Sequence, residues 1–575
     1  MRKHIKITLS VILTLSASVV FSQEQEADTI KTGVIDVVKP YAPSISDAFK
    51  VKEVPSLDDA VTDSKKEIKY NIFSFPVAST FTPAKGKAAV VEKAKPIKLY
   101  DNYATLGVGT YTTILGEVYL NHAISRNESV GGYVSHHSSA GGIENLMFDD
   151  KFSNTKLKAN YTTRLRDLAW NVEGGFQHQM YNWYGVPESQ IATARADNIE
   201  TDHTFFDVHI GGDVTFEDTY INSGSVLFRR FADNQGSGEN RLTLKATVDV
   251  PVNREEISTE FKIDYLGGSF DRNYQTNTPL DYGNFQVGLS PTYQLKQDDL
   301  TVNLGVSAYY LNDTEAGESK FFIYPNVTAT YRLVSDVLIA YGGIEGDLIQ
   351  NSYHDFANEN NFVSPTLFIT PTDKQYNAYV GLKGKLSSHM SYNVSGSYTS
   401  EKNKALYKNN DITLTSQAYS YGNSFGMIYD DISTFGFVGE INFDVNRNFK
   451  LGLKAEYFSY STDNETEAWN LPDIKGSAFL DYQIDSHWFT GANLFFVGER
   501  KDQFYLNDGA STASPLTVNL DSYFDANAHV GYHITDQISA FLKINNIANE
   551  GYQRWQNFPV QSIQFLAGAT YKFDF

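Results

Sequence analysis

Apolar and polar residues alternate with a period of two over most of the chain from Asp101 to its last residue. Every second residue from Leu300 to Tyr310 is leucine, valine, alanine or tyrosine, and threonine, asparagine, glycine and serine separate the first five of them. Successive side chains of a β-strand point to opposite faces, so the pattern predicts strands with one apolar face and one polar face. Segments 241–250 and 376–383 repeat it, with lysine, arginine and aspartate among the polar positions. Such charges are costly against lipid, and they predict a hydrated second face.

Short polar turns punctuate these alternating segments at regular intervals. They lie at 125–128, 166–167, 217–219, 252–255, 296–299, 334–336, 386–389, 445–448, 484–487 and 534–537. Ten turns separate nine units of two strands, and one further hairpin at each end brings the total to about 22 strands. An even number returns both ends of the strand region to one side of a membrane, as single-chain outer-membrane barrels require. We therefore predict an all-β fold: a transmembrane antiparallel up-and-down β-barrel over residues 101–575.

The connections at the opposite end of each hairpin are longer and more variable. They are expected at 139–153, 182–200, 271–281, 351–373, 403–430, 462–471, 502–516 and 549–560. Short turns on one side and long loops on the other indicate that the long side faces outward. A β-propeller is the rival fold, but each unit holds two long strands rather than four short ones. Ten units also exceed the usual ~4–8 blades.

The N-terminus predicts export. Arg2, Lys3 and Lys6 precede a largely apolar stretch and small residues before Gln23, which indicates a signal peptide at 1–22 that is cleaved after Ser22. No later run reaches the ~18 apolar residues of a membrane helix, so strands must cross the bilayer. We predict the outer membrane of a Gram-negative bacterium, with outer-membrane lipid and the barrel-assembly machinery as partners.

Composition narrows the remaining functional classes. Aromatic residues make up 14% of the chain, which suits a sheet in lipid with rings at the interfaces. A net charge of −21 argues against nucleic acid as a partner. The absence of cysteine excludes disulfides and thiolate metal sites.

Residues 23–100 differ from the barrel region. They contain several prolines and a group of lysines between Lys85 and Lys98, and little alternation is sustained. We expect a weakly structured segment that lies in the periplasm or against the barrel lumen.

The last strand carries the sharpest family signal. Alternation over Val560–Phe575 ends in Tyr571, Phe573 and Phe575, which we interpret as the C-terminal signal for barrel insertion. The run Ile544–Asn549 precedes this strand. Together they resemble the C-terminal end of TonB-dependent outer-membrane receptors, and the opening of the strand region, from Leu99, is similar to Bacteroidetes-type barrels of that family.

That resemblance implies a 22-stranded barrel, a compact plug domain in its lumen and a TonB box near the mature N-terminus. Residues 23–100 are too few and too proline-broken for a normal plug, so a recognisable plug is missing. The segment that matches a TonB box, which would add a strand to its partner, is Gly33, Val34, Ile35, Asp36, Val37 and Val38. A plain β-prone stretch in a tail explains the same residues.

Two functions from different classes follow. The first is a barrel of the TonB-receptor type that passes or captures a solute, narrowed by loops 351–373 and 403–430 or by the N-terminal segment, with TonB or a surface lipoprotein as candidate partners. The second is a structural or assembly subunit of a larger outer-membrane complex, without transport of its own. An enzyme is not predicted.

Candidate catalytic and metal residues have plain structural explanations. Gly422–Gly426 matches G-x-S-x-G around Ser424, but it lies between barrel strands rather than in a strand–turn–helix elbow. His136 and His137 are adjacent on a strand, so they point to opposite faces and cannot easily share a metal with Asp149 and Asp150.

Two loop groups remain open to a ligand. Asp463, Glu465 and Glu467 suit Ca²⁺, although a solvated loop is the favoured interpretation. Aromatic residues at loop bases suit apolar or carbohydrate ligands, although anchoring at the membrane interface is the favoured interpretation; they are Trp183, Tyr184, Trp469 and Trp555. We therefore predict no catalytic, cofactor-binding or metal-binding residue.

Overall fold

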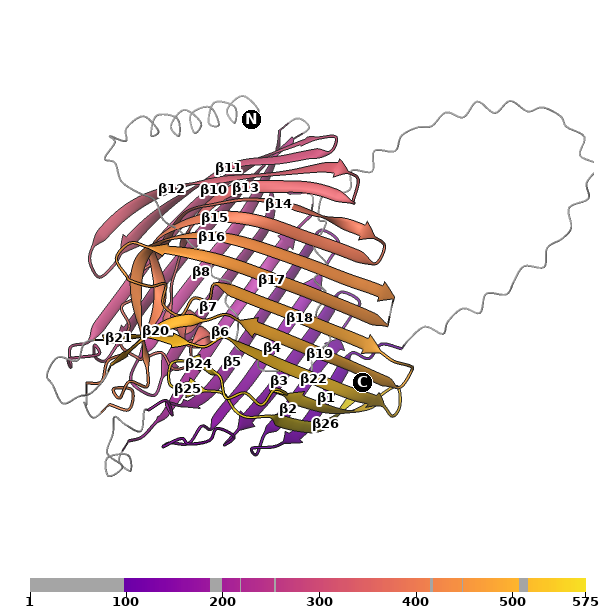
Figure 1. Ribbon diagram of the computed structural model, residues 1–575. Coiled ribbons are helices and arrows are strands. Elements are labelled where there is room, and N and C mark those ends of the chain that lie inside the picture. The colour runs from indigo at the N-terminus through magenta and orange to yellow at the C-terminus, as the bar shows by residue number, and fades with distance from the viewer. Residues whose placement is uncertain are drawn as a thin grey trace, which may run out of the picture.

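The protein is a closed antiparallel β-barrel (Figure 1). The computed structural model describes residues 98–186, 199–217, 219–252, 255–413, 417–446, 448–505 and 515–575. Within them, 22 strands form one sheet in which each strand pairs with its neighbours along the chain. The first strand also pairs with the last, so the sheet has no free edge and every strand finds backbone partners in lipid. The predicted fold is confirmed.

The strands coincide with the segments of alternating apolar and polar residues. The barrel strands are β1 (Asn102–Gly109), β2 (Ile114–Ala123), β3 (Glu128–Ser139), β4 (Phe152–Arg164), β5 (Leu168–Asn182), β6 (Asp202–Phe216), β7 (Ile221–Asp233), β8 (Gly238–Val252), β9 (Glu255–Phe270), β10 (Leu280–Gln297), β11 (Leu300–Asp313), β12 (Glu318–Val334), β13 (Leu338–Ile349), β14 (Thr372–Ser387), β15 (Met390–Asn409), β16 (Phe425–Asn446), β17 (Phe449–Thr462), β18 (Ile474–Gln483), β19 (Trp488–Val497), β22 (Tyr523–His533), β23 (Ile538–Asn545) and β26 (Gln564–Phe573). Two hairpins stand outside this sheet, β20 (Arg500–Tyr505) with β21 (Pro515–Leu520) and β24 (Gln553–Trp555) with β25 (Phe558–Pro559). The helix α4 (Tyr353–Glu359) lies between β13 and β14.

The ten predicted turns each join two consecutive barrel strands. They share one end of the barrel, here called the turn end, with the start of β1 and the end of β26; the other end is the loop end. One predicted loop, 403–430, is shorter than expected, because β15 continues to Asn409 and β16 begins at Phe425. Paired strands therefore extend into the loop end, where other loops pack on them.

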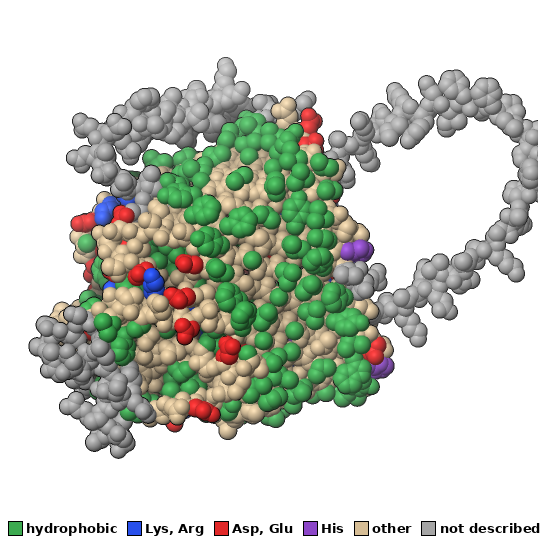
Figure 2. All heavy atoms as spheres, in the orientation of Figure 1, with side chains coloured by type: hydrophobic (Ala, Val, Ile, Leu, Met, Phe, Trp, Pro, Cys, Tyr) green, Lys and Arg blue, Asp and Glu red, His purple; other side chains and the backbone are tan. Residues whose placement is uncertain are grey.

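In the barrel wall, the apolar residues of the alternating pattern face outward and the polar residues face inward. Val306 on β11 is exposed on the lipid face, whereas its neighbour Ser307 is buried on the inner face. Figure 2 shows apolar side chains over much of the barrel face in view, and most of the acidic side chains in that view lie nearer the loop end. On β26 the apolar Leu566 interrupts the polar face, and it packs inside the barrel with Leu115 and Phe541.

The seam between β1 and β26 closes tightly because small residues meet there. Gly107 lies opposite Gly568, and a Cβ on Gly568 would collide with the carbonyl oxygen of Leu106 and the ring of Phe541. At the turn end, Asp574 accepts a hydrogen bond from the Asp101 amide at 3.0 Å and forms an ion pair with Lys98 at 2.9 Å. The two ends of the barrel sheet are thereby tied together.

Among the described residues, no helix is both long and apolar enough to span a bilayer. The predicted signal peptide, nearly all of the segment 23–100 and the TonB-box-like stretch Gly33–Val38 lie outside the described residues.

Candidate functional site

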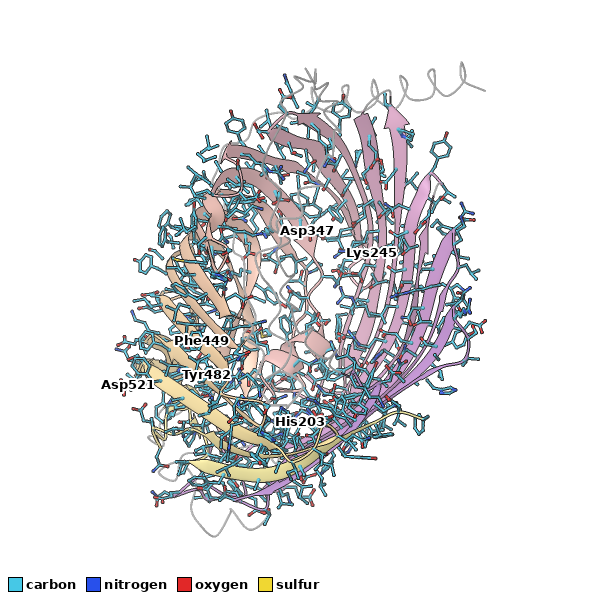
Figure 3. All side chains as sticks on the ribbon, turned by 90° about the vertical axis from the view of Figure 1, so that its right-hand side faces the viewer. His203, Lys245, Asp347, Phe449, Tyr482 and Asp521 are labelled. Atoms are coloured by element: carbon cyan, nitrogen blue, oxygen red, sulfur yellow. The ribbon has the colours of Figure 1, made fainter. Side chains whose placement is uncertain are left out.

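Loops gather inside the loop end of the barrel and form a cap. We define the cap as residues 183–186, 350–371, 417–424 and 553–559, which come from four separate connections. Its core is one cluster of buried apolar side chains that joins the wall at β6–β10 to the wall at β15–β16. Figure 3, viewed from the turn end, shows a helix inside the ring of strands, with His203, Lys245 and Asp347 labelled within that ring. Parts of the two loops that we expect to narrow the lumen, 351–373 and 403–430, therefore belong to the cap, and the alternative, the N-terminal segment, lies outside the described residues.

The first turn of the helix α4 is capped. Ser352 accepts a hydrogen bond through its Oγ from the Asp355 amide at 3.1 Å, and Asp355 places negative charge in the first turn. Tyr353 and Phe356 turn toward the core of the cap and are buried. The helix ends at Asn360, whose amide donates to the carbonyl oxygen of Phe356 at 2.9 Å.

Two buried carboxylates join α4 to the wall. Glu239 on β8 accepts hydrogen bonds from the Tyr353 amide at 2.6 Å, from the His354 amide at 3.3 Å and from the Tyr282 hydroxyl at 2.8 Å. Asp233 on β7 accepts one from the Tyr353 hydroxyl at 2.7 Å. The Tyr353 ring sits among phenylalanine rings of β6, β7 and β9, at centroid distances of 6.1, 5.2 and 5.1 Å. Tyr353 thus fills an aromatic socket with a carboxylate at its base.

A continuous chain of charged and imidazole groups crosses the same junction, and we call it the charge ladder. Its members in order are His209, Asp207, Arg229, His354, Asp355, Arg241, Asp264 and Lys262. Two steps cross between wall and helix, Arg229 to His354 at 3.4 Å and Arg241 to Asp355 at 3.2 Å. The pair His354 to Asp355, at 3.0 Å within α4, connects them. The Asp355 side chain remains 50% exposed, so water reaches the ladder at its centre.

The opposite side of the cap is held by backbone pairing. Phe425 on β16 donates its amide to the carbonyl oxygen of Phe362 at 3.0 Å and accepts from the Ser364 amide at 2.8 Å.

A buried carboxylate, Asp502 on β20, lies near the end of β15, where it accepts a hydrogen bond from the Asn409 amide at 3.0 Å. Burial raises the pKa of Asp502 to about 6, although the amides of Asn409 and Gln503 oppose the rise.

The three candidate calcium ligands, Asp463, Glu465 and Glu467, are held by separate contacts. Glu465 binds Lys408 at 3.1 Å and Glu467 binds Lys501 at 2.9 Å. The amides of Asp463 and Glu465 donate instead to Asp430, at 3.2 and 2.9 Å. Among the described residues, no three histidine or carboxylate side chains come together as a metal site.

The interpretation of the loop-base aromatics as membrane-interface anchors is wrong. Trp183, Trp469 and Trp555 are 0%, 1% and 8% exposed, and Trp183 and Trp555 belong to the core of the cap. Tyr184 donates its hydroxyl to the carbonyl oxygen of Pro559 at 2.9 Å. These rings pack loops on loops, and the pattern of a loop sequence carries no period that distinguishes this from a position in lipid.

The remaining candidates are structural. Ser424 is fully buried, donates its hydroxyl to the carbonyl oxygen of Tyr419 at 2.7 Å and precedes a strand rather than a helix. His136 contacts Thr155 at 2.8 Å. Asp150 instead accepts backbone amides, including that of Ile143 at 3.2 Å. No nucleophile elbow and no shared histidine–aspartate site is found among these described residues.

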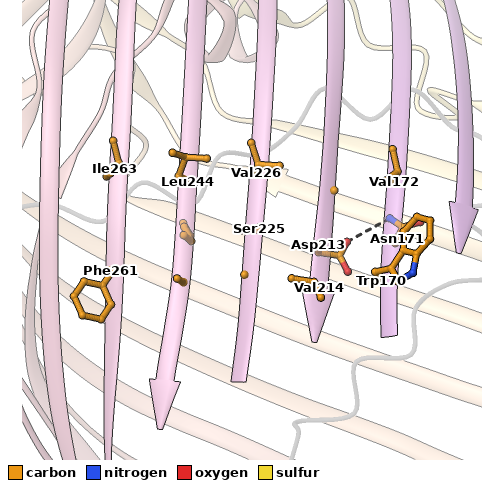
Figure 4. Close-up of a pocket in the computed structure, with 14 residues that line it drawn as sticks. Trp170, Asn171, Val172, Asp213, Val214, Ser225, Val226, Leu244, Phe261 and Ile263 are labelled. Atoms are coloured by element: carbon orange, nitrogen blue, oxygen red, sulfur yellow. Dashed lines mark hydrogen bonds between the residues drawn. The ribbon is translucent and has the colours of Figure 1, made fainter. Parts of the chain in front are cut away.

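An apolar hollow lies on the lipid face of β5–β9 and is separate from the cap (Figure 4). It is lined by the small residues Gly212, Gly224 and Ala246 and by larger apolar side chains such as Val226 and Phe261. Asn171 and Asp213 occupy intervening positions and form a hydrogen bond of 3.3 Å. Because these apolar side chains alternate with that pair, the hollow faces hydrocarbon rather than the lumen.

No protein-family model and no curated protein match the sequence. Among solved structures, the chain is similar to the ferripyoverdine receptor of the outer membrane of Pseudomonas aeruginosa bound to ferripyoverdine, with a TM-score of 0.60, 15% identity and coverage of 84% of this chain and 73% of that chain. The siderophore receptor PirA from Acinetobacter baumannii matches with a TM-score of 0.61 and 13% identity, over 82% of this chain and 80% of that chain. The ferric-catecholate import receptor Fiu from E. coli K12 matches with a TM-score of 0.57 and 12% identity, over 82% of this chain and 82% of that chain. At such identities the likeness is one of fold, and it places this chain among barrels shaped like those of outer-membrane siderophore receptors.

Proposed function

We propose that this protein is an outer-membrane uptake barrel of the TonB-receptor type, of the Bacteroidetes kind, in which the cap takes the occluding role of a plug. The observation that carries the proposal is the cap itself, because four connections converge on one buried core inside the loop end of the barrel. A barrel that served only as a scaffold would not need buried loops across its interior. A wide conduit does need an obstruction, since an open lumen would leak solutes.

The inner wall supports passage of a hydrophilic solute. Amide and hydroxyl side chains line it in hydrogen-bonded rows, for example Gln294 to Asn303 at 2.9 Å and Asn303 to Thr328 at 3.0 Å. Charged side chains line the inner wall elsewhere, for example Lys454 and Glu456 of β17, which form an ion pair at 2.8 Å. Such a surface is wetted and binds polar groups. The named functions of the structural neighbours make iron–siderophore complexes the first class to test.

Conductance in planar bilayers tests the proposal. We expect the full chain, purified from outer membranes in detergent, to show only rare brief openings. Replacing residues 352–370 with a short Gly-Ser linker should give a steady conductance that is larger by at least tenfold. A cap-deleted barrel that folds, remains silent and co-purifies with a fixed partner would favour the structural-subunit alternative.

Energised uptake is a separate part of the proposal. If Gly33–Val38 acts as a TonB box, deleting it abolishes accumulation of the transported solute in cells while the conductance of the purified barrel stays unchanged. A deletion that leaves uptake intact removes TonB as a partner. A surface lipoprotein partner is tested by pulling the intact protein from native membranes and identifying what accompanies it.

A further inference from the structure

We infer that the cap opens along one line, the junction between α4 and the β6–β9 wall, and that the charge ladder is the latch on that line. The inference rests on the proposed function, because a latch has a role only if the cap gates a conduit. It adds which part of the cap separates and which residues hold it shut.

The two sides of the cap are attached by different kinds of contact. Toward β16, Phe362 and Ser364 pair with Phe425 through backbone hydrogen bonds, and the Phe362 ring stacks on Phe558 at a centroid distance of 3.7 Å. Tyr407 on β15 donates its hydroxyl to the carbonyl oxygen of Phe356 at 3.1 Å. Backbone hydrogen bonds fix this side of the cap to β16, so it moves as a unit with β15 and β16.

Toward β6–β9 the attachment is made by side chains. Apart from the Tyr353 ring in its socket, the described polar contacts of α4 on this side are the carboxylates of Asp233 and Glu239 and the ladder residues Arg229 and Arg241. No barrel strand pairs with α4 through a backbone ladder on this side. Side-chain contacts of this kind can separate and re-form without unravelling the sheet.

The ladder is also the part of the junction that water and ions reach. Asp355 is 50% exposed, and the Arg229 and Arg241 side chains are each 22% exposed, whereas Asp233 is fully buried. The base of segment 350–371 remains clasped when the latch opens, because Asn351 donates its side-chain amide to the Thr370 carbonyl oxygen at 2.7 Å and to Thr372 at 2.9 Å. Asp355 is therefore the place in the junction where a change of charge can weaken the contact of α4 with the wall while the buried socket of Tyr353 stays intact.

Reversing the charge of Asp355 tests the latch in the full-length protein. In planar bilayers, Asp355→Lys places a cation against Arg241 and should raise the open probability at least tenfold, while Asp355→Glu should behave as wild type. Glu467→Lys is the matched control, because Glu467 is a similarly exposed cap-side carboxylate whose partner, Lys501, lies away from the latch. High salt should suppress the Asp355→Lys effect, since 1 M salt shortens the screening length to ~3 Å.

Equal open probabilities for Asp355→Lys and Glu467→Lys would overturn the latch. The cap-deleted barrel distinguishes this from failure of the proposed function: if it conducts while Asp355→Lys stays closed, the conduit stands and the latch falls. If neither conducts, both fall. Circular dichroism and heat-dependent gel migration of each variant establish that the barrel has folded before conductance is compared.

Discussion

At the scale of single residues, burial decides what a polar side chain does in this barrel. Glu239 and Asp233 are surrounded by donors, so their carboxylates hold α4 in place. Asp502 is also buried, and it receives the backbone amides of Asn409 and Gln503. Burial disfavours the charged form of this carboxylate, so the pKa of Asp502 rises.

The raised pKa of Asp502 predicts a pH-dependent loop end. Because the folded pKa is about 6 and the ordinary value is 3.8, the folded state binds the proton more tightly, and stability is greatest below pH 4. It should fall by up to roughly 3 kcal/mol as the pH rises from about 4 to about 6, and stay level above that. Hydrogen exchange of β20 and β21 amides, corrected for intrinsic rates, should show the change. Asp502→Asn should abolish this dependence of stability on pH. If the stability of that variant still falls between about pH 4 and about pH 6, another group is responsible.

The sequence predicts the face of a strand residue well and the role of a loop residue poorly. Val306 and Ser307 follow directly from alternation, because the pleat fixes their faces. Trp183 and Trp555 lie in connections without a period, and their burial depends on loops that arrive from distant parts of the chain. The same separation hides the charge ladder, whose members Arg241 and Asp355 are 114 residues apart.

At the scale of elements, turns were predictable and the cap was not. Each polar turn is a local signal, because its residues and the strands that it joins are contiguous. The helix α4 is only seven residues long, too short to be stable alone, so it exists because Tyr353 and Phe356 are buried by other segments. The hairpins β20–β21 and β24–β25 form within long loops for the same reason. The sequence points to loops 351–373 and 403–430 as the segments that narrow the lumen. It does not predict the helix α4 or the buried core of the cap that these loops help to form.

Tyr353 should be the residue on which the docking of α4 depends most. Tyr353→Ala empties the aromatic socket and should destabilise the docked cap by ~3–5 kcal/mol, by analogy with large-to-small aromatic substitutions in cores. Tyr353→Phe keeps the ring but leaves Asp233 with one fewer donor, at a cost of ~1–3 kcal/mol. Amide exchange at Phe356 and Asn360 measures both. Equal exchange in the two variants would mean that the ring contributes nothing beyond its hydroxyl.

At the scale of the whole molecule, closure of the sheet is the condition for everything else. The first and last strands are separated by nearly the entire described chain, yet they pair over eight positions from Asn102 to Gly109. Gly568→Val should block this pairing, because its side chain would meet the Leu106 carbonyl and the Phe541 ring. Gly551→Val is the control, since nothing lies within 4 Å of a Cβ there. Folded barrels migrate anomalously in unheated gels, and only the control should retain that band.

The end of β26 should govern how efficiently the barrel reaches its closed state. Tyr571 and Phe573 stack on the lipid side at a centroid distance of 5.3 Å, and Phe575 continues the row, 78% exposed and edge-on to Phe573. Because Tyr571 and Phe575 are largely exposed, we propose that the row serves recognition by the assembly machinery. Removing Phe575 should lower the amount of protein in the outer membrane several-fold while leaving barrels refolded in detergent as stable as wild type. Substituting Leu566, which packs inside, should do the opposite: Leu566→Ala costs ~2–5 kcal/mol of barrel stability but spares assembly. If both changes lower membrane levels and refolded stability in parallel, the terminal rings act through packing, and the insertion signal must lie elsewhere.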